Sequence, residues 1–169
     1  FGYILDKYQH WSTYEPEEKG VLIVYASMYG NTEAAAQDLA ARLCEKGITN
    51  TRLYDVSSTH VSELISQTFK YSHLLASVTY NLGIYPVMLD YLEDMKALNL
   101  QKRTVAIIEN GSWAIKSGDL MQKFLDDNMK DMTVLNERVS LASTLPDDKV
   151  SEMEQLAQAL ADSVNGVEK

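Results

Sequence analysis

The chain has 169 residues, 46% of them hydrophobic and 23% charged, and its formal net charge at pH 7 is -9. This length and composition predict one globular domain that buries enough apolar surface to fold without cross-links. The negative charge argues against nucleic acids and anionic membranes as partners, since both reward clustered lysine and arginine. No apolar run reaches the ~20 residues of a membrane span, and the single cysteine, Cys44, has no partner for an internal disulfide. We therefore expect a cytoplasmic protein.

The first twenty residues differ in character from the rest of the chain. Tyr3, Ile4, Tyr8 and Trp11 are spaced as on one face of a short amphipathic helix, and a polar Glu-Pro-Glu-Glu-Lys-Gly stretch follows. A start at phenylalanine rather than methionine fits a fragment. Residues 1–20 are therefore predicted to be a linker or terminal segment from an upstream domain, and residues 21–169 the domain itself. A terminal helix that covers this domain's own surface explains the pattern equally well.

From Val21 onward, short apolar runs alternate with helical periods, which is typical of a doubly wound α/β fold with helices on both faces of a parallel sheet. The predicted strands are Val21–Ser27, Thr51–Val56, His73–Thr79, Thr104–Glu109 and Val139–Ser143. The first, third and fourth are almost continuously apolar, as central strands covered on both faces are. The more polar second and fifth strands suit the edges of the sheet.

Apolar residues at helical spacing predict five helices between and after these strands. Their buried stripes, in chain order, are Ala36, Leu39, Ala40 and Leu43; Val61, Leu64 and Ile65; Val87, Tyr91 and Met95; Leu120, Met121, Phe124 and Leu125; and Val150, Met153, Ala157, Leu160 and Val164. Gly47 and Gly166 are suited to end the first and last of these helices, and Pro86 to open the third.

The segment after the first strand leads directly into a helix and reads Ser27, Met28, Tyr29, Gly30, Asn31, Thr32. Free backbone N–H groups and the positive dipole end of a helix start bind anions, and Gly30 permits a tight turn. Because the segment has no lysine or arginine, a phosphate here would be held by neutral dipoles. It lacks the Gly-Lys pair of a Walker loop and the three glycines of a dinucleotide fingerprint. The alternative is an ordinary capped turn.

Two other segments belong to the same place, because ligands of such a sheet bind outside the carboxyl ends of the strands, where the winding reverses. They are Thr79, Tyr80, Asn81, Leu82 and Gly83 after the third strand, and Asn110, Gly111, Ser112, Trp113 and Ala114 after the fourth. Each combines flexible backbone with an aromatic ring, and Trp113 or Tyr80 would stack on a flat heteroaromatic ligand. Tyr85 is better explained as hydrophobic cover for the strand ends.

Taken together, Ser27–Thr32, Thr79-Tyr80-Asn81 and Gly111-Ser112-Trp113 resemble the flavodoxin family, whose five-stranded parallel sheet has the order 2-1-3-4-5. More narrowly, residues 4–33, ILDKYQHWSTYEPEEKGVLIVYASMYGNTE, look like the joint between the diiron domain and the flavodoxin domain of flavodiiron proteins. A Met-Tyr pair such as Met28-Tyr29 is familiar in that branch.

The resemblance implies FMN as the cofactor, with its phosphate at Ser27–Thr32 and its isoalloxazine between the Tyr80 and Trp113 segments. It implies an electron-transfer domain with no catalytic or metal-binding residues of its own. A soluble donor such as a rubredoxin or a reductase would supply electrons, which pass to a diiron oxygen or nitric oxide reductase site on an upstream metallo-β-lactamase-like domain. Whole proteins of this kind form head-to-tail homo-oligomers.

The remaining metal-ligand and nucleophile types are predicted to be structural. His10, His60 and His73 have no spacing that assembles a two-metal site, and Cys44 is expected to pack against the core. Two alternative functions stay open: a free-standing flavodoxin-type carrier, and a cofactor-free interaction module such as a receiver domain, which would need acidic residues where Ala26 and Ser27 stand. A quinone reductase of the same fold is a third, testable by nicotinamide oxidation with a quinone.

Overall fold

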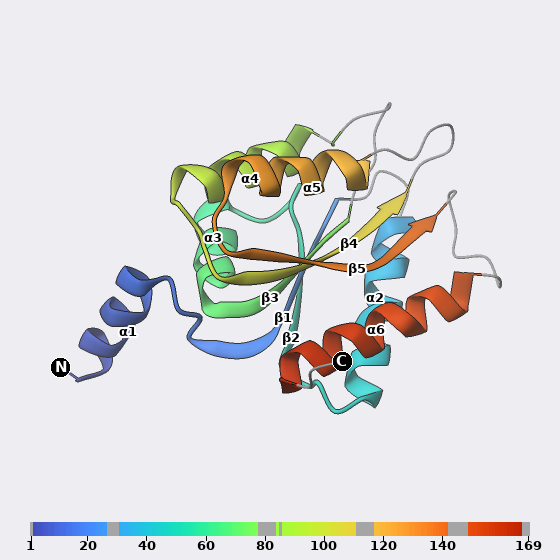
Figure 1. Cartoon of the computed structure of the whole chain (residues 1–169), viewed down its shortest axis with the longest axis horizontal. Helices are drawn as coiled ribbons and strands as arrows, with labels where there is room; N and C mark the ends of the chain where they lie inside the picture. The colour runs from blue at the N-terminus through green and yellow to red at the C-terminus, as the bar shows by residue number, and fades with distance from the viewer. Residues whose placement is uncertain are drawn as a thin grey trace.

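A computed structural model describes residues 2–26, 31–77, 84, 86–110, 117–141 and 149–166. Its centre is a parallel sheet with the strand order β2-β1-β3-β4-β5, which lies between two layers of helices (Figure 1). This arrangement confirms the predicted fold class, including β2 and β5 as edge strands. The elements are α1 (Gly2–Thr13), β1 (Glu18–Tyr25), α2 (Asn31–Glu45), β2 (Thr51–Asp55), α3 (Val61–Lys70), β3 (Tyr71–Ser77), α4 (Pro86–Ala97), β4 (Arg103–Asn110), α5 (Ser117–Asn128), β5 (Met132–Leu141) and α6 (Val150–Asn165).

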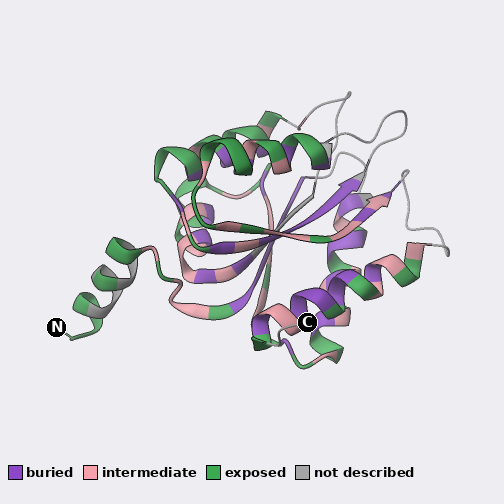
Figure 2. Cartoon of the chain, viewed as in Figure 1, coloured by how far each residue is buried: buried purple, intermediate pink, exposed green. Residues whose placement is uncertain are grey.

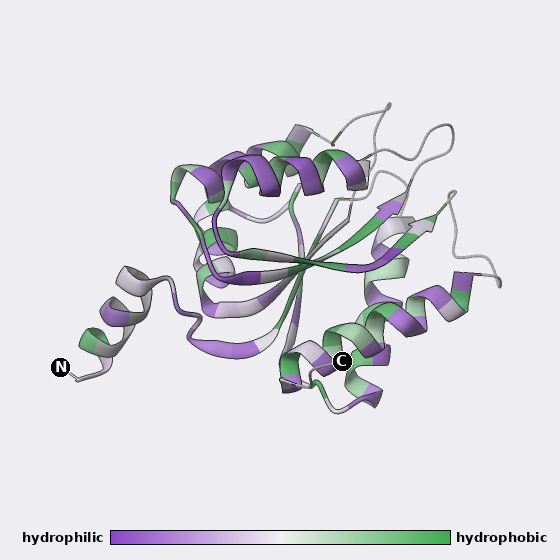
Figure 3. Cartoon of the chain, in the orientation of Figure 1, coloured by the Kyte–Doolittle hydropathy of each residue, from purple (hydrophilic) through white to green (hydrophobic). Residues whose placement is uncertain are grey.

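Each face of the sheet has its own apolar core. The α2 and α6 helices cover one face and α3, α4 and α5 cover the other, so buried residues line the strands between them (Figure 2). Alternate residues of β1 serve opposite cores, with Val21 and Ile23 in the first and Leu22 and Val24 in the second. The outward sides of α4 and α5 are mostly polar (Figure 3), with Leu89 and Leu120 as the exposed apolar exceptions among their described residues. Strands buried on both faces therefore account for the continuous apolar runs in the sequence.

The predicted helical stripes are confirmed except at their margins. Three residues expected to be buried are exposed: Val61 at 47%, Leu120 at 40% and Val150 at 37%. Val61 and Val150 are the first residues of α3 and α6, where a helix has not yet passed over the sheet. Leu120 precedes the buried Met121, and the turn from one residue to the next rotates it away from the core. Gly47 and Gly166 follow α2 and α6 with positive φ, as helix-ending glycines do.

The fifth strand differs most from its prediction, because β5 runs from Met132 to Leu141 instead of starting at Val139. Its register against β4 shifts between the pairs Val105–Val134 and Ile107–Arg138, so β5 carries extra residues there. The first half of the strand is only partly buried and its irregular middle is polar, so this half has no continuous apolar run in the sequence. The predicted residues beyond Leu141 lie outside the described part of the chain.

Two of the three histidines have structural roles. His60 precedes α3, and its Nδ1 accepts a hydrogen bond from the Ser62 N–H at 3.2 Å. His73 is 6% exposed on β3, with its Nδ1 2.7 Å from Ser72 Oγ and its Nε2 2.7 Å from Ser163 Oγ on α6. Burial lowers the pKa of His73 to about 4, so the ring is neutral at pH 7. The side chain of His10 lies outside the described residues.

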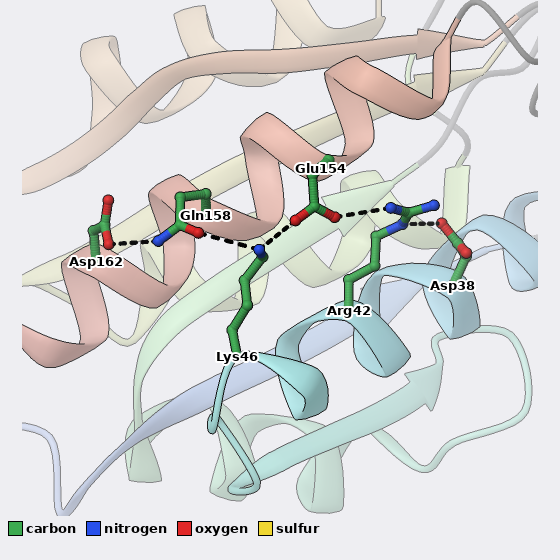
Figure 4. Close-up of polar contacts among 6 residues, drawn as sticks. All are labelled: Asp38, Arg42, Lys46, Glu154, Gln158 and Asp162. Carbon is green, nitrogen blue, oxygen red and sulfur yellow. Dashed lines mark hydrogen bonds and ion pairs between the residues drawn. The ribbon is translucent and has the colours of Figure 1, made fainter.

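The prediction for Cys44 is wrong, since this cysteine is exposed on α2. It comes one position after the buried Leu43, which places it off the stripe that faces the sheet. A row of polar side chains instead connects this helix to α6 (Figure 4). Arg42 Nη1 lies 2.8 Å from Glu154 Oε2, and Lys46 Nζ binds the other oxygen of the same carboxylate. The arrangement holds α2 against α6 across their exposed seam.

The amino end of the sheet is closed by Arg103, the first residue of β4, which is 1% exposed. Its Nη1 donates to the carbonyls of Tyr14 at 2.6 Å and Gln101 at 2.7 Å, and its Nη2 donates to Phe69 at 2.9 Å. Burial lowers the pKa of the guanidinium to about 10, so the group is still charged at pH 7. Nothing in the sequence pattern pointed to this residue.

The segment that follows α1 is held at this same end. Lys102 Nζ lies 2.7 Å from Glu15 Oε1, and Asn99 Nδ2 donates to Tyr14 Oη at 3.2 Å. The α1 helix itself lies apart from the sheet and its helical layers, at the far left of Figure 1, and Tyr3 and Ile4 are exposed on it. The chain therefore leaves α1 and enters the domain at the end opposite to the carboxyl ends of the strands.

Candidate functional site

The carboxyl ends of the parallel strands meet at one edge of the sheet. Tyr25 of β1 pairs with Asp55 of β2 and with Ser77 of β3, and Asn110 of β4 pairs with Leu141 of β5. The strand order reverses at β1, because the chain moves outward from β1 to β2 and then crosses back to β3. A crevice outside the strand ends at such a reversal is where ligands of open α/β sheets bind.

Most of the predicted site residues lie outside the described part of the chain. These are Ser27, Met28, Tyr29 and Gly30; Thr79, Tyr80, Asn81, Leu82 and Gly83; and Gly111, Ser112, Trp113 and Ala114; Tyr85 falls outside as well. The described flanks show where each segment attaches. Each joins the carboxyl end of one strand to the start of the next helix: β1 to α2, β3 to α4, and β4 to α5.

Three predicted site residues belong to described elements. Asn31 is the first residue of α2, Thr32 is the next and is 7% exposed, and Asn110 is the last residue of β4. The side chains of Asn31 and Asn110 lie outside the described set. The structure therefore brings the starts of α2 and α5 and the ends of β1, β3 and β4 to one edge.

The helix starts at this edge differ in what they offer an anion. At α3, His60 already caps the first turn, and α4 begins with Pro86, which has no N–H to donate. At α5, the Gly118 N–H donates to the Glu109 carboxylate at 2.8 Å. The α2 helix follows the central strand β1 directly beside the strand reversal, whereas α6 follows the edge strand β5. The donors at the start of α2 are therefore the best placed for a phosphate.

The described side chains around this helix start are neutral or acidic. Tyr25 is buried at the end of β1, and its pKa is raised by desolvation and then by the carboxylates of Glu33 and Asp55. The phenol is therefore uncharged at neutral pH. An anion bound next to it would depend on backbone N–H groups and hydroxyls, in keeping with the absence of lysine and arginine from Ser27–Thr32.

Glu109 is the residue of this edge that sequence reasoning missed as a site residue. It is 5% exposed, one position before the end of β4, and its two carboxylate oxygens have separate donors. One oxygen accepts from the Gly118 N–H at 2.8 Å and the other from Ser140 Oγ at 2.6 Å. The sequence does carry a signal for it, since Glu109 is a carboxylate at the end of the otherwise apolar predicted strand Thr104–Glu109.

A family model described as flavodoxin matches residues 23–138, which include β1 to β4 and most of β5. The chain belongs to the flavodoxin family. FMN is the cofactor of this family, and the geometry at the start of α2 fits its phosphate. The first two residues of α2 are uncharged and lie beside the strand reversal, whereas at the start of α5 the Gly118 N–H already donates to a carboxylate.

Flavodoxin-family proteins similar to this chain include longer ones. The chain is 26% identical over 160 residues to the rubredoxin-oxygen oxidoreductase of Megalodesulfovibrio gigas, covering 94% of this chain and 39% of that protein. The structure of a flavodiiron protein from Giardia intestinalis aligns over 98% of this chain and 41% of its own, with a TM-score of 0.87 at 18% identity. An archaeal flavodoxin aligns over 86% of this chain and 99% of its own, with a TM-score of 0.70 at 19% identity.

The chain thus spans about two-fifths of the length of the rubredoxin-oxygen oxidoreductase and of the Giardia flavodiiron protein. Among its described residues, no helix is both long and apolar enough to cross a membrane. Over the same ranges, histidine, cysteine, aspartate and glutamate side chains do not gather in threes as metal ligands do.

Proposed function

We propose that this chain is the FMN-binding, electron-transfer part of a longer flavodiiron-type protein. FMN, when bound, supplies reversible electron transfer in one- and two-electron steps. In this proposal the protein holds the phosphate at Ser27–Thr32. It encloses the ring with the Thr79–Gly83 and Asn110–Ala114 segments, where Tyr80 and Trp113 supply the stacking surfaces.

The observation that carries the proposal is the arrangement of helix starts at the carboxyl edge. The α2 start is beside the strand reversal, while His60, Pro86 and Glu109 make the starts of α3, α4 and α5 poorer anion sites. If the phosphate were held at α2, the ends of β1, β3 and β4, where the other two segments attach, would be available to hold the rest of the cofactor. The family match supports the same assignment.

The extent of the structural likeness favours the flavodiiron branch over a free-standing carrier. Alignment to the Giardia protein extends over 98% of the chain, against 86% for the archaeal flavodoxin. We therefore propose that residues 1–20 connect to an upstream domain with a diiron oxygen or nitric oxide reductase site. In this proposal a soluble donor such as a rubredoxin or a reductase supplies the electrons, and the whole protein is a cytoplasmic homo-oligomer.

An absorption spectrum of the purified chain tests the cofactor assignment. We expect two visible flavin bands that persist through gel filtration, or that return when FMN is added to the apoprotein. Replacing Asn31 by Leu and Thr32 by Val should abolish binding at micromolar FMN, because both substitutions remove polar groups from the phosphate site. Ser62→Ala, at the start of α3, is the matched control and should leave binding unchanged. A colourless chain that refuses FMN contradicts the proposal.

Oxygen consumption tests the role in the longer protein. We expect the product of the complete gene to reduce oxygen or nitric oxide with a reduced rubredoxin-type donor. The 169-residue chain alone should accept electrons from that donor without sustaining such turnover. If the gene contains no upstream iron-ligand motifs and the chain alone shuttles electrons between two soluble proteins, the free-standing carrier is correct instead.

A further inference from the structure

A single buried carboxylate connects the two ends of the segment that carries Trp113. Glu109 is the residue before the last of β4, and Gly118 is the second residue of α5. The 2.8 Å hydrogen bond from the Gly118 N–H to Glu109 Oε2 therefore closes the chain around residues 110–117. On its other side, Glu109 Oε1 accepts from Ser140 of β5 at 2.6 Å, which fixes the carboxylate against the neighbouring strand.

The backbone of α5 is fitted closely to this carboxylate. A Cβ added at Gly118 would lie 2.5 Å from Glu109 Oε2 and 2.9 Å from its Cδ, closer than real Cβ atoms come to other atoms. The same position is 3.0 Å from Nη1 of Arg138. Arg138 in turn donates to Asp119 Oδ1 at 2.6 Å and to Gln122 Oε1 at 2.6 Å. The first turn of α5 is thus held by side chains from both β4 and β5.

An apolar residue would be the ordinary choice at position 109. Val105 and Ile107, which alternate with Glu109 along β4, are buried in the core beneath α3, α4 and α5. A buried carboxylate is unfavourable unless hydrogen bonds replace its hydration. What a carboxylate provides here, and an apolar side chain does not, is a fixed distance between the end of β4 and the start of α5.

We infer that Glu109 is a positioning residue for the cofactor: by holding Gly118 and Ser140 it fixes the end of β4 and the start of α5, between which the chain segment proposed to contact the flavin is attached. This inference depends on the proposed function, since it assumes FMN at this edge. It goes further in naming a residue that acts on the flavin through the chain segment it closes and does not itself touch the ring.

Four variants of the chain test the inference, with the FMN dissociation constant and the midpoint potential of bound FMN as the measurements. Glu109→Ala should weaken FMN binding at least ~10-fold, because it releases the Gly118 N–H. Gly118→Ala should do the same by displacing the carboxylate. Glu109→Gln should stay within about 3-fold of wild type, because its amide accepts from Gly118 and donates to Ser140. Val105→Ala, a cavity on the same face of the same strand, should lower Tm and leave the dissociation constant unchanged.

A double-mutant cycle separates positioning from general loss of structure. If Glu109 acts through Trp113, then Glu109→Ala should weaken binding far less in a Trp113→Ala background than in wild type. The midpoint potential should shift in Glu109→Ala and Gly118→Ala but not in Val105→Ala. If Glu109 has only a structural role, Glu109→Ala, Gly118→Ala and Val105→Ala should share the same FMN affinity and midpoint potential, or Glu109→Ala should lose as much affinity in the Trp113→Ala background as in wild type. Either result overturns the inference.

The outcomes distinguish this inference from the proposed function. Wild-type protein that fails to bind FMN overturns the proposed function and this inference with it. Wild-type protein that binds FMN, together with Glu109→Ala and Gly118→Ala variants that bind equally well, overturns this inference alone. If Glu109→Ala does not fold, Gly118→Ala decides the matter, because alanine favours the helix and its Cβ meets side-chain atoms of Glu109 and Arg138 and no backbone atoms among its nearest neighbours.

Discussion

Each end of β4 buries an ionisable side chain, and the two side chains hold different parts of the chain. Arg103 opens the strand at the amino end of the sheet and is 1% exposed, while Glu109 lies one residue before its carboxyl end and is 5% exposed. Both side chains bind backbone groups of segments outside the sheet. Arg103 donates to carbonyls of Tyr14, Gln101 and Phe69, and Glu109 accepts from the N–H of Gly118.

The two side chains differ in the segment that each of them holds. Arg103 holds the stretch between α1 and β1 together with the end of α3, at the end of the sheet opposite to the candidate site. Glu109 holds the start of α5, next to a segment proposed to contact the flavin. At one end, a buried side chain that binds backbone groups attaches the stretch between α1 and β1 and stabilises the fold. At the other end, the same kind of contact is proposed to position the cofactor. Variants at the two ends should separate these roles.

The largest expected effect is on stability, from Arg103→Met. The substitution keeps most of the side-chain volume but leaves buried carbonyls without their donor, so the free energy of unfolding should fall by about 3 kcal/mol. Urea unfolding measures the change. The FMN dissociation constant, measured where the variant is fully folded, should not change. An Arg103→Met variant that loses FMN affinity while keeping its stability would break the proposed separation of the two ends.

The second effect is a pH dependence of stability set by His73, between β3 and α6. The folded chain keeps this ring neutral down to about pH 4, whereas the unfolded chain binds a proton below about pH 6.5. Stability from this residue is therefore complete above pH 6.5 and is lost as the pH falls toward 4. The loss between pH 7 and pH 5 should be about 2 kcal/mol.

Urea unfolding of wild type and His73→Gln at several pH values isolates this contribution. The glutamine can still bond the hydroxyls of Ser72 and Ser163, but it does not titrate. We expect the wild-type curve to fall more steeply than the variant curve between pH 7 and pH 5. Parallel curves would show that His73 does not control acid stability. FMN binding at pH 7 should be the same in both proteins, because His73 belongs to the amino half of the sheet.

A smaller effect, on the carboxyl end, is expected from Ser140→Ala. This change removes one of the two donors to Glu109 and leaves the Gly118 hydrogen bond in place. FMN affinity should fall about 3-fold, between wild type and Glu109→Ala, because one of the two hydrogen bonds that hold the carboxylate is kept. A titration monitored by flavin fluorescence measures it. If Ser140→Ala loses as much FMN affinity as Glu109→Ala, then the contact with Ser140, and not the contact with Gly118, is the main positioning contact.

The smallest effect concerns the exposed seam between α2 and α6 (Figure 4). Hydrogen bonds from Lys46 and Arg42 lower the pKa of the Glu154 carboxyl, so this contribution to stability is present at pH 7 and is lost as the pH falls through the lowered value. Glu154→Gln should reduce Tm slightly at low ionic strength and not at high salt, because exposed ion pairs are screened. A reduction that persists at high salt would indicate packing instead of charge.

The sequence was sufficient for the layered fold because most of its signal is local. Continuous apolar runs identified β1, β3 and β4 as central strands, and helical stripes such as Leu39 and Leu43 identified the faces that cover them. Errors occurred where local signal is weak. Val61 and Val150 begin helices, and β5 is a half-buried edge strand with a polar, irregular middle.

The candidate site likewise contains some features that local sequence indicates and others that it does not. Its three segments stay predictions, because most of their residues lie outside the described part of the chain; the structure shows that they attach at the ends of β1, β3 and β4. Arg103 and Glu109 were not predicted, because a buried charge is recognisable only from its partners. Tyr14 is far from Arg103 in sequence, and the relation of Glu109 to Gly118 appears only when α5 has been placed on the sheet.

The most direct test of the central claim compares the affinities of the apoprotein for FMN and for riboflavin, which lacks the phosphate. If uncharged donors at the start of α2 hold the phosphate, FMN should bind at least ~100-fold more tightly, because two or more charge-assisted hydrogen bonds are lost with riboflavin. In the variant with Asn31→Leu and Thr32→Val, the affinity for FMN should fall to the weaker affinity for riboflavin, so that the preference disappears. Equal affinities of the wild-type chain for the two flavins would contradict the account.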